Sequence, residues 1–403
     1  MKRIKRLSQD LLEKSKQYTF KRYFYPLIGS KGVISFVIGA RGVGKTIAIL
    51  QYLASKVKEK KVLYISADHI LTQEFSLYDI AESFVNEGGE IIAFDEIHKR
   101  HDWEIELKSI FDSFSTLEVL ASGSSALKMK KADLSRRHIK LHCQGLSFRE
   151  FTELQYNIEL PLVDLEGLVK NCDDLGNNVI KILGSHKINV HELFEDYLQV
   201  GYFPTTSKLN RKIYHQSILE SLDKMIKEDI PACYPSLTGL AIKKIAKLLA
   251  IVSANVPYVV NLNKLNQVLG VNDIKTLKNY LYHLEEVGAI IAVSKVGEKL
   301  SSLKKPEKIF LENTNYMYAL TGADSNIGTV RETFVANALG NIGKVFVPEK
   351  GDFITESGFS FEVGGRSKHL SQIANVKNSW IISDNLDFPE ERKIPIWMFG
   401  LLW

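Results

Sequence analysis

The sequence predicts an α/β protein that begins with a parallel sheet built around a phosphate-binding loop. Three observations predict this fold. A glycine-rich run, Gly39–Thr46, stands between a short apolar run and a stretch of helical spacing, and a later apolar run ends in Asp95 and Glu96. A further apolar run lies between the two motifs, so that short strands alternate with helices, as they do in parallel sheets. The apolar runs that we expect to form strands are residues 33–38, 61–65, 91–94, 117–121 and 139–142.

The glycine-rich run matches G-x-x-x-x-G-K-[ST], the pattern of loops that hold the phosphates of nucleoside triphosphates. Backbone N–H groups of such a loop surround the phosphates at the N-terminus of the following helix, here residues 47–57. We expect Lys45 to reach the β- and γ-phosphates and the Thr46 hydroxyl to bind Mg²⁺. The alternative is a chance glycine turn. The predicted nucleotide-binding residues are Gly39, Ala40, Arg41, Gly42, Val43, Gly44, Lys45 and Thr46.

The second motif predicts a hydrolytic site. A buried strand that ends in Asp95-Glu96 is typical of a Walker B motif, in which Asp95 holds Mg²⁺ and Glu96 orients and polarises the attacking water. The alternative is a buried strand that merely ends in two acids. One strand between the loop and this motif, with Glu directly after Asp, is the arrangement of additional-strand, catalytic-Glu ATPases and differs from that of kinases and small GTPases.

Other polar residues flank the fourth and fifth predicted strands. Ser122 and Ser124 follow the fourth strand, where a polar residue can contact the γ-phosphate, although an ordinary polar turn explains them equally well. Arg137 stands just before the fifth strand, where an arginine can neutralise transition-state charge in cis or from a neighbouring subunit. The alternative is a solvated pair of arginines. His98 and His101 have no further ligand at zinc spacing, so we expect the start of a surface helix there.

Motifs spread along the chain resemble one known family. They are Gly39–Thr46, Phe94–Lys99 with Trp103, Ala121–Ser125, Leu146–Phe151, Tyr197–Pro204 and Glu228–Ile230. Together they resemble the prokaryotic AAA-type ATP-binding proteins that carry a C-terminal domain of unknown function. The chain keeps the family's Arg41 but has Ala40 and Gly42 where Pro and Gln are usual, and Arg137 matches the family's arginine before the fifth strand. The resemblance covers nearly the whole chain and implies ATP and Mg²⁺ as ligands.

The middle of the chain is mostly helical by its spacing, and we expect residues 163–240 to form a lid over the nucleotide. Three helices and a strand then suggest a winged helix-turn-helix. These elements are residues 241–251, 263–269, 273–287 and 289–293, and a basic run, 295–305, follows them. If this module binds DNA, its third helix presents Lys275, Lys278, Asn279 and Tyr282. Because this helix carries two glutamates and no arginine, a structural module that couples the ATPase to the C-terminal domain is the favoured alternative.

The C-terminal part has the layout of a restriction-endonuclease-like metal nuclease, a fold that the resembled family is thought to carry. In such a site, acids hold Mg²⁺ and a lysine positions water. Gly364 stands where the lysine belongs, and Lys368 can replace it only if the strand ends early and the side chain folds back. A degenerate scaffold that binds a protein partner is therefore favoured, with the apolar run 394–403 packed inside or exposed to the partner. The possible vestigial site residues are Glu332, Asp352, Glu362 and Lys368.

Composition sets broad limits on the function. The 403 residues are 45% hydrophobic and 25% charged with a formal net charge of +5, which is ordinary for a globular protein and permits an acidic partner. Three scattered cysteines fit a reducing compartment. No apolar run approaches the ~18–20 residues of a membrane span, and the basic N-terminus lacks the apolar core of a signal peptide, so we expect a cytoplasmic protein without a membrane partner.

These patterns predict four domains and one fully equipped active site. The expected function is slow hydrolysis of MgATP that switches the C-terminal modules, with Lys45, Glu96 and Arg137 in catalysis. The alternative is an ATP-controlled DNA-binding regulator or a nuclease-associated protein of a mobile-element or defence system. The sequence leaves the oligomeric state open. The expected domains are a P-loop ATPase domain (1–160), a helical lid (161–238), a winged-helix-like domain (239–305) and a restriction-endonuclease-like domain (306–403).

Overall fold

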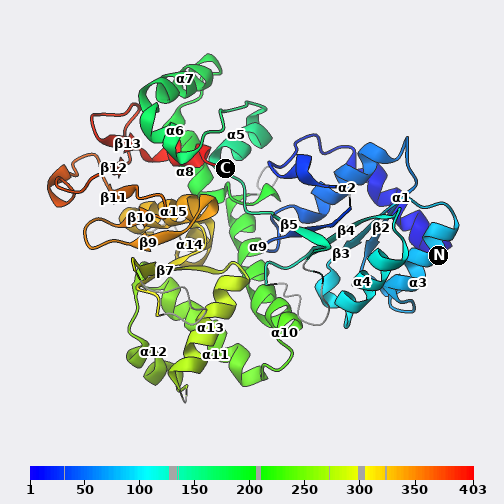
Figure 1. The fold of residues 1–403 in the computed structure, drawn as a ribbon. Helices are drawn as coiled ribbons and strands as arrows, with labels where there is room; N and C mark the ends of the chain where they lie inside the picture. The colour runs from blue at the N-terminus through cyan, green and yellow to red at the C-terminus, as the bar shows by residue number, and fades with distance from the viewer. Residues whose placement is uncertain are drawn as a thin grey trace. The chain divides into compact units, whose positions relative to one another are not determined.

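The computed structural model forms two compact units, each made of two stretches of the chain. One unit is Met1–Gln144 with Glu228–Ser236, and the other is Gly145–Lys227 with Leu237–Trp403 (Figure 1). The described residues are 1–403 except 31, 127–133, 135, 206–209, 272, 298–304 and 323–324, so most of the basic run 295–305 lies outside them. The finer four-domain division stays a prediction, because these two units do not distinguish its boundaries.

The first unit is built on a five-stranded parallel sheet, as the alternation of strands and helices predicts. Its strand order is β2-β3-β4-β1-β5, which places β4 between the strand before the glycine loop and the strand that ends in Asp95. All carboxyl ends therefore lie along one edge of the sheet. The strands are β1 (Ile34–Ile38), β2 (Val62–Ser66), β3 (Ile91–Asp95), β4 (Glu118–Gly123) and β5 (His138–His142).

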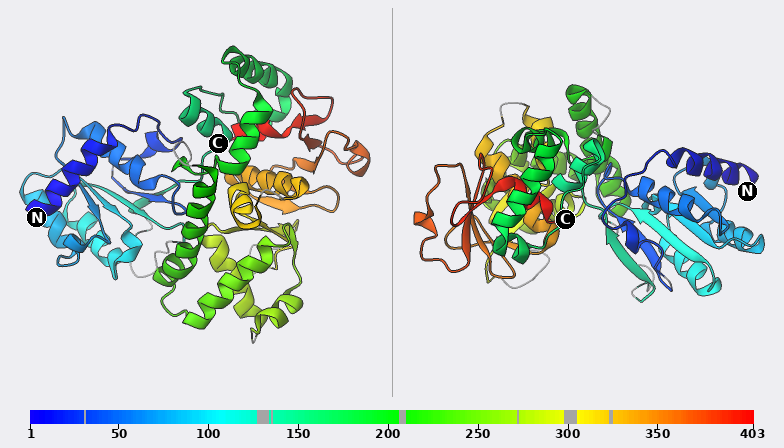
Figure 2. Two further views of the ribbon diagram at one scale, coloured as in Figure 1. Left: turned by 180° about the vertical axis from the view of Figure 1, so that it is seen from behind. Right: turned by 90° about the horizontal axis from the view of Figure 1, so that it is seen from above.

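Helices cover both faces of this sheet (Figure 2). Every residue of β1 and β3 is buried, which explains why these runs are continuously apolar rather than alternating. Side chains at alternate strand positions share one face, where they form a core with α3 and α4. The helix after the loop buries Ala48, Ile49 and Leu53. The helices are α1 (Lys2–Ser15), α2 (Lys45–Lys56), α3 (Leu77–Asn86), α4 (Trp103–Ser113) and the short α10 (Ile230–Cys233).

The second unit contains an eight-stranded mixed sheet with the order β13-β12-β11-β10-β9-β7-β8-β6. The parallel pairing of β7 with β9 joins two segments, 239–305 and 306–403, that the sequence pattern treats as separate domains. Its strands are β6 (Tyr258–Val259), β7 (Ile290–Lys295), β8 (Lys308–Leu311), β9 (Val345–Val347), β10 (Phe353–Thr355), β11 (Ser360–Gly364), β12 (Ser379–Ser383) and β13 (Lys393–Pro395).

The middle of the chain, where the spacing of apolar residues predicts helices, is helical in the structure. Before Lys227 they are α5 (Phe148–Tyr156), α6 (Leu165–Lys170), α7 (Cys172–Ser185), α8 (Val190–Val200) and α9 (Arg211–Lys224). Later in the chain they are α11 (Gly239–Ser253), α12 (Leu262–Leu269), α13 (Ile274–Glu286), α14 (Thr314–Thr321) and α15 (Ile327–Ile342). No helix in the described part of the chain has the length and apolar character to cross a membrane.

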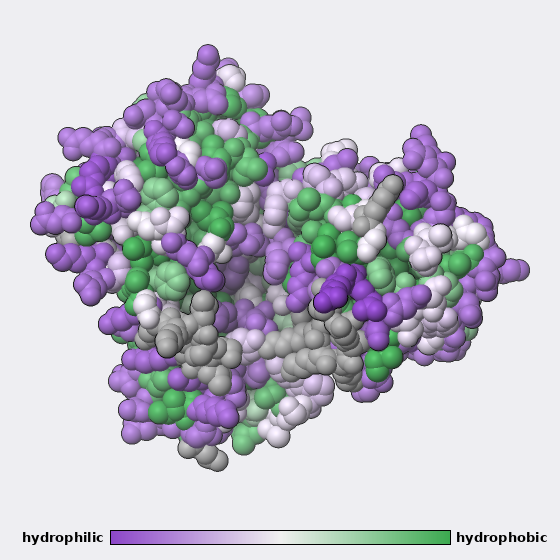
Figure 3. All heavy atoms as spheres, viewed as in Figure 1, coloured by the Kyte–Doolittle hydropathy of each residue, from purple (hydrophilic) through white to green (hydrophobic). Residues whose placement is uncertain are grey.

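The apolar C-terminal run is buried, which confirms that it packs into its own unit. It forms the 3₁₀ helix η7 (Ile396–Leu401), in which Trp397 and Phe399 are buried. The Trp403 indole N–H donates to the Gly145 carbonyl. On the face drawn in Figure 3, the exposed apolar residues are interrupted by polar ones.

The contact between η7 and α5 leaves no room for a larger residue at Gly400. A Cβ there would lie 2.4 Å from the Phe148 Cβ, whereas a Cβ at Gly340 of α15 meets nothing within 4 Å. We expect Gly400→Ala to destabilise the second unit by about 1–3 kcal/mol through overpacking. Gly340→Ala is the matched control and stabilises it by about 0.5–1 kcal/mol, because alanine favours the helix. Thermal unfolding measures both, and an unchanged midpoint for Gly400→Ala contradicts the packing described here.

Candidate active site

The glycine-rich loop connects β1 to α2 at the carboxyl edge of the first unit's sheet. Gly44 is the N-cap of α2 and has φ 100°, a left-handed conformation that suits glycine. At Gly39 a Cβ would lie 2.1 Å from the Cys143 carbonyl oxygen, so only glycine fits beside the end of β5. The loop therefore turns sharply into a helix N-terminus, where free backbone N–H groups and the helix dipole favour an anion.

The Lys45 ammonium lies against this loop. Its Nζ donates to the carbonyl oxygens of Gly39 at 3.0 Å and Ala40 at 2.9 Å, and the residue is 6% exposed. These carbonyls hold the cation directly over the backbone on which a phosphate would bind. A phosphate there would meet a positive charge at short range with little competing water.

Asp95 at the end of β3 gathers side chains from the loop and from both neighbouring strands. Its Oδ2 accepts from Thr46 Oγ1 and from the Tyr64 hydroxyl, each at 2.6 Å. Its Oδ1 accepts from the Ser122 hydroxyl and, at 3.1 Å, from the Glu96 backbone N–H. Because β3 lies between β2 and β4, the register of the sheet brings Tyr64 and Ser122 to this carboxylate. Four donors fix the position of a carboxylate that is buried in the core.

Thr46 and Asp95 are suitable ligands for Mg²⁺. A hydroxyl and a carboxylate oxygen already lie 2.6 Å apart, and Mg²⁺ prefers oxygen ligands. Within the described ranges, no group of three or more His, Cys, Asp or Glu side chains could hold a metal ion. One or two protein ligands are usual for Mg²⁺ where phosphates and water supply the others.

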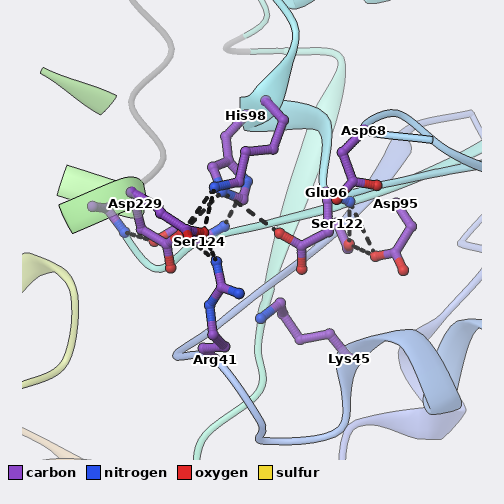
Figure 4. Close-up of polar contacts among 12 residues, drawn as sticks. Arg41, Lys45, Asp68, Asp95, Glu96, His98, Ser122, Ser124 and Asp229 are labelled. Carbon is purple, nitrogen blue, oxygen red and sulfur yellow. Dashed lines mark hydrogen bonds and ion pairs between the residues drawn. The ribbon is translucent and has the colours of Figure 1, made fainter. Parts of the chain in front are cut away.

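Glu96 follows Asp95 in a left-handed backbone conformation with φ 53°, which is uncommon for a residue other than glycine. Its backbone N–H donates to Asp95 and, at 3.2 Å, to Ser122 Oγ, and these bonds hold the turn. The side chain is 29% exposed, so its carboxylate can reach solvent next to the loop. Figure 4 shows Glu96 between Asp95 and His98.

His98 is buried, so the expectation of a surface helix start at this residue is wrong. It lies in the short 3₁₀ helix η3 (Ile97–Lys99), and its side chain is 2% exposed. Its Nδ1 accepts from the Ser124 backbone N–H at 3.3 Å. This burial was not evident from the sequence, because the ring is enclosed by segments that are distant along the chain. His101 is exposed and pairs with Asp102.

A cluster of charged residues joins the loop to the segment Glu228–Ser236. Arg41 in the loop contacts Asp229 Oδ1 at 2.8 Å and Glu228 Oε2 at 3.2 Å. Lys99 contacts the same two oxygens at 3.2 and 3.7 Å. Burial alone would raise the pKa of Asp229, but the His98 ring and the Arg41 guanidinium outweigh it and hold that pKa well below its ordinary value. Asp229 is therefore ionised and holds this segment to the loop (Figure 4).

The other residues predicted to contact nucleotide lie at different places. Ser122 is engaged with Asp95 and Glu96, and Ser124 contacts His98 through its backbone N–H. Arg137 precedes β5, and its carbonyl pairs with Ile34 at the amino end of β1, the opposite edge of the sheet from the loop. Its guanidinium contacts Asp112 at 2.8 Å. A role for Arg137 in cis does not fit this placement, and a role in trans stays a prediction.

The acids predicted for a nuclease-like site are each paired with a lysine. Lys308 of β8 lies 3.5 Å from Glu332 and 3.4 Å from Asp352, and Lys368 lies 2.5 Å from Glu362. Burial and the charge of Asp352 raise the pKa of Glu332, while the Lys308 ammonium opposes this rise. Sequence spacing could not identify Lys308, because it belongs to a strand far from these acids in the sequence.

Lys368 takes the conformation that a replacement for the missing lysine requires. The strand β11 ends at Gly364, and the Lys368 side chain folds back over it so closely that a Cβ at 364 would lie 2.8 Å from the Lys368 Cγ. The glycine thus makes room for the lysine. With both lysines in ion pairs, cations of the protein itself neutralise the acids, and this arrangement gives no support to bound Mg²⁺.

Comparison with known proteins finds two family models that match parts of the chain. Residues 31–152 match a family model described as AAA domain, and residues 191–326 match one described as Domain of unknown function (DUF8612). An uncharacterized protein of Methanocaldococcus jannaschii is 28% identical over 244 residues, which cover 57% of this chain and 49% of the relative. The chain thus spans about half the length of the curated relative that it matches.

Similar solved structures include the AMPPCP-bound DnaA from Aquifex aeolicus (16% identity, 70% of this chain and 88% of that chain, TM-score 0.26). Another is PCH-2 from C. elegans (13% identity, 69% and 67%, TM-score 0.27). Such low scores do not establish a shared fold. The family match, the parallel sheet and the phosphate loop together support a P-loop ATPase domain of the AAA type that binds nucleotide.

The position of Lys45 gives a test of the nucleotide site. We expect Lys45→Ala to weaken the binding of a fluorescent ATP analogue by roughly tenfold to a hundredfold, because a buried charge-assisted contact to phosphate is lost. Lys58→Ala removes an exposed lysine just beyond α2 and serves as the control. Equal affinities for the two variants would show that the phosphates bind elsewhere.

Proposed function

We propose that this protein is an ATPase of the AAA type that binds MgATP and hydrolyses it slowly. The observation that carries the proposal is the meeting of Thr46, Asp95 and Glu96 beside Lys45 at one edge of the sheet. Residues from two separate motifs thus supply a phosphate contact, a pair of Mg²⁺ ligands and a carboxylate for water. Structural ion pairs alone would not require this combination.

The proposed reaction follows from these positions. The loop N–H groups and Lys45 would hold the β- and γ-phosphates, and Thr46 and Asp95 would hold Mg²⁺, which would supply positive charge to the reaction when bound. Glu96 accepts a proton from water as the water oxygen bonds to the γ-phosphorus. The bond between that phosphorus and the bridging oxygen breaks, and ADP leaves with the electron pair. Asp95 is assigned to Mg²⁺ rather than to the water, because its carboxylate lies beside the Thr46 hydroxyl.

We further propose that the cycle of binding and hydrolysis acts on the second unit through the segment Glu228–Ser236. This segment lies in the sequence between two stretches of the second unit but belongs to the nucleotide-binding unit. Its Asp229 contacts Arg41 of the phosphate loop. A change in the loop would therefore move the segment Glu228–Ser236, and both ends of this segment continue into the second unit.

Glu96→Gln tests the hydrolytic proposal. We expect this variant to lower ATP turnover by roughly 10²–10⁴-fold, because an amide cannot accept the proton, while the affinity for a fluorescent ATP analogue stays unchanged. Glu82→Gln makes the same chemical change at an exposed position of α3 and keeps wild-type turnover. If Glu96→Gln hydrolyses ATP as fast as the wild type, Glu96 is not the base.

A DNA-binding regulator is the second candidate, favoured by the order of elements in 239–311. Three helices, α11, α12 and α13, precede the antiparallel strands β7 and β8, and β6 pairs with the outer side of β8. This order is that of a winged helix, in which the third helix contacts DNA. Lys275 lies exposed near the start of α13. Here ATP would set the conformation, and DNA would be the partner.

Salt dependence tests this second candidate. If the module binds DNA, the affinity of the full chain for a duplex, measured by fluorescence anisotropy, falls steeply as salt rises from about 50 to 200 mM, because counterions are released. Lys275→Ala lowers the slope of this dependence by about one. Lys181→Ala, an exposed lysine on α7, leaves the slope unchanged. The absence of binding at the lowest salt contradicts this candidate.

A further inference from the structure

The His98 ring has one hydrogen to donate and, among the described residues, no acceptor within hydrogen-bond distance. Because the Ser124 N–H donates to Nδ1, that nitrogen is unprotonated and the hydrogen of the neutral ring lies on Nε2. The Nε2 atom is buried and has no hydrogen-bond partner within the part of the chain that the structure describes. The side chain is 2% exposed, which keeps bulk water from the ring. A buried donor without an acceptor is unfavourable, so a small rearrangement that supplies one is favoured.

Two carboxylates lie near this nitrogen at almost equal distances. Glu96 Oε2 is 3.6 Å from Nε2, and Asp229 Oδ1 is 3.8 Å from it. Both distances exceed a normal N–H···O bond, which is about 2.7–3.2 Å long. A shift below one ångström would let either carboxylate accept the hydrogen, but a single N–H cannot form a strong bond to both. Figure 4 shows the ring facing both acids.

We propose that His98 and Asp229 are positioning residues for Glu96, an inference that rests on the proposed ATP hydrolysis. When Asp229 accepts the His98 N–H, the Glu96 carboxylate is released and can orient water. When Glu96 accepts it, the carboxylate is held toward the ring and away from water. Asp229 thus acts on the reaction through His98 without contacting nucleotide.

Which carboxylate accepts the His98 N–H depends on residues around Asp229, and these come from the loop and from the segment Glu228–Ser236. Arg41, a residue of the phosphate loop, contacts the same Asp229 oxygen that faces His98. Lys99, which follows His98, contacts it as well. Movement of the loop or of the segment would change how strongly Asp229 accepts from the ring. The position of that segment therefore affects whether the Glu96 carboxylate is free to orient water.

The neighbouring acid Glu228 separates this role from simple anchoring. Like Asp229, Glu228 contacts Arg41 and Lys99, here at 3.2 and 3.7 Å. It is half exposed, and among the described residues it forms no ion pair with His98. If the cluster only ties the segment to the loop, loss of either acid should have a similar effect. If Asp229 acts through His98, only its loss should slow hydrolysis.

The experiment compares ATP turnover by the full chain carrying Asp229→Asn, Glu228→Gln, His98→Phe or the double change His98→Phe with Asp229→Asn. Because a neutral amide accepts more weakly than a carboxylate, Asp229→Asn gives the His98 hydrogen to Glu96 and lowers kcat by roughly tenfold or more. Analogue affinity stays within about twofold of wild type, since Lys45 and the loop backbone N–H groups keep their places. Glu228→Gln keeps kcat within about twofold.

The His98 variants decide between positioning and anchoring. His98→Phe removes the donor and keeps wild-type or faster turnover, and in this background Asp229→Asn has no further effect. His98→Gln retains a side-chain N–H and restores the sensitivity to Asp229→Asn. If the phenylalanine ring is not accommodated, His98→Met serves as the donor-free variant.

Three results would overturn the inference in distinguishable ways. Independent, multiplicative losses for the His98 and Asp229 changes would show that Asp229 does not act through the ring. Equal losses for Asp229→Asn and Glu228→Gln would show that the cluster only anchors the segment. Absence of turnover in the wild type, or wild-type turnover in Glu96→Gln, would contradict the proposed hydrolysis itself and the positioning role with it.

Discussion

The candidate site at the carboxyl edge of the first unit's sheet is held together by the hydrogen bonds that the Asp95 carboxylate accepts. This carboxylate accepts hydrogen bonds from the loop, from a neighbouring strand on each side and from the backbone of Glu96, so it fixes four segments relative to one another. The left-handed turn at Glu96 is held by two of these groups. Without this buried acceptor, the hydroxyls of Thr46, Tyr64 and Ser122 would lose a partner in the core, and Glu96 would lose its defined direction.

A second set of charged residues connects the edge of the sheet to the segment Glu228–Ser236, which is distant in the sequence. Asp229 is ionised with the cations of Arg41 and Lys99 against it and the His98 ring nearby, and the phosphate loop supplies one of those cations through Arg41. The segment that carries Asp229 belongs to the nucleotide-binding unit, although the residues on both sides of it belong to the other. The Asp229 carboxylate therefore links the phosphate loop to the segment that connects two stretches of the second unit.

In the second unit, lysines balance the charge of the acids that the sequence predicts for a vestigial nuclease site. Lys308 pairs with Glu332 and Asp352, and Lys368 pairs with Glu362. The same unit joins the helices of 239–286 and the C-terminal strands through one sheet.

The sequence by itself determined the parallel sheet, the loop and the acids at the end of β3, because apolar runs, glycines and adjacent polar residues record local backbone and burial requirements. It also pointed to Lys368 as a lysine that could stand in for the one missing at Gly364 if its side chain folded back, and the side chain does fold back over Gly364. Tyr64, His98, Asp229 and Lys308 were not assigned to sites, since their roles come from contacts between segments far apart in the chain. Arg137 shows the same limit. The sequence placed it just before β5, but it did not show that this position lies at the edge of the sheet opposite the loop. Only the tertiary structure decided these roles, since strand order and register determine which distant side chains share a buried space.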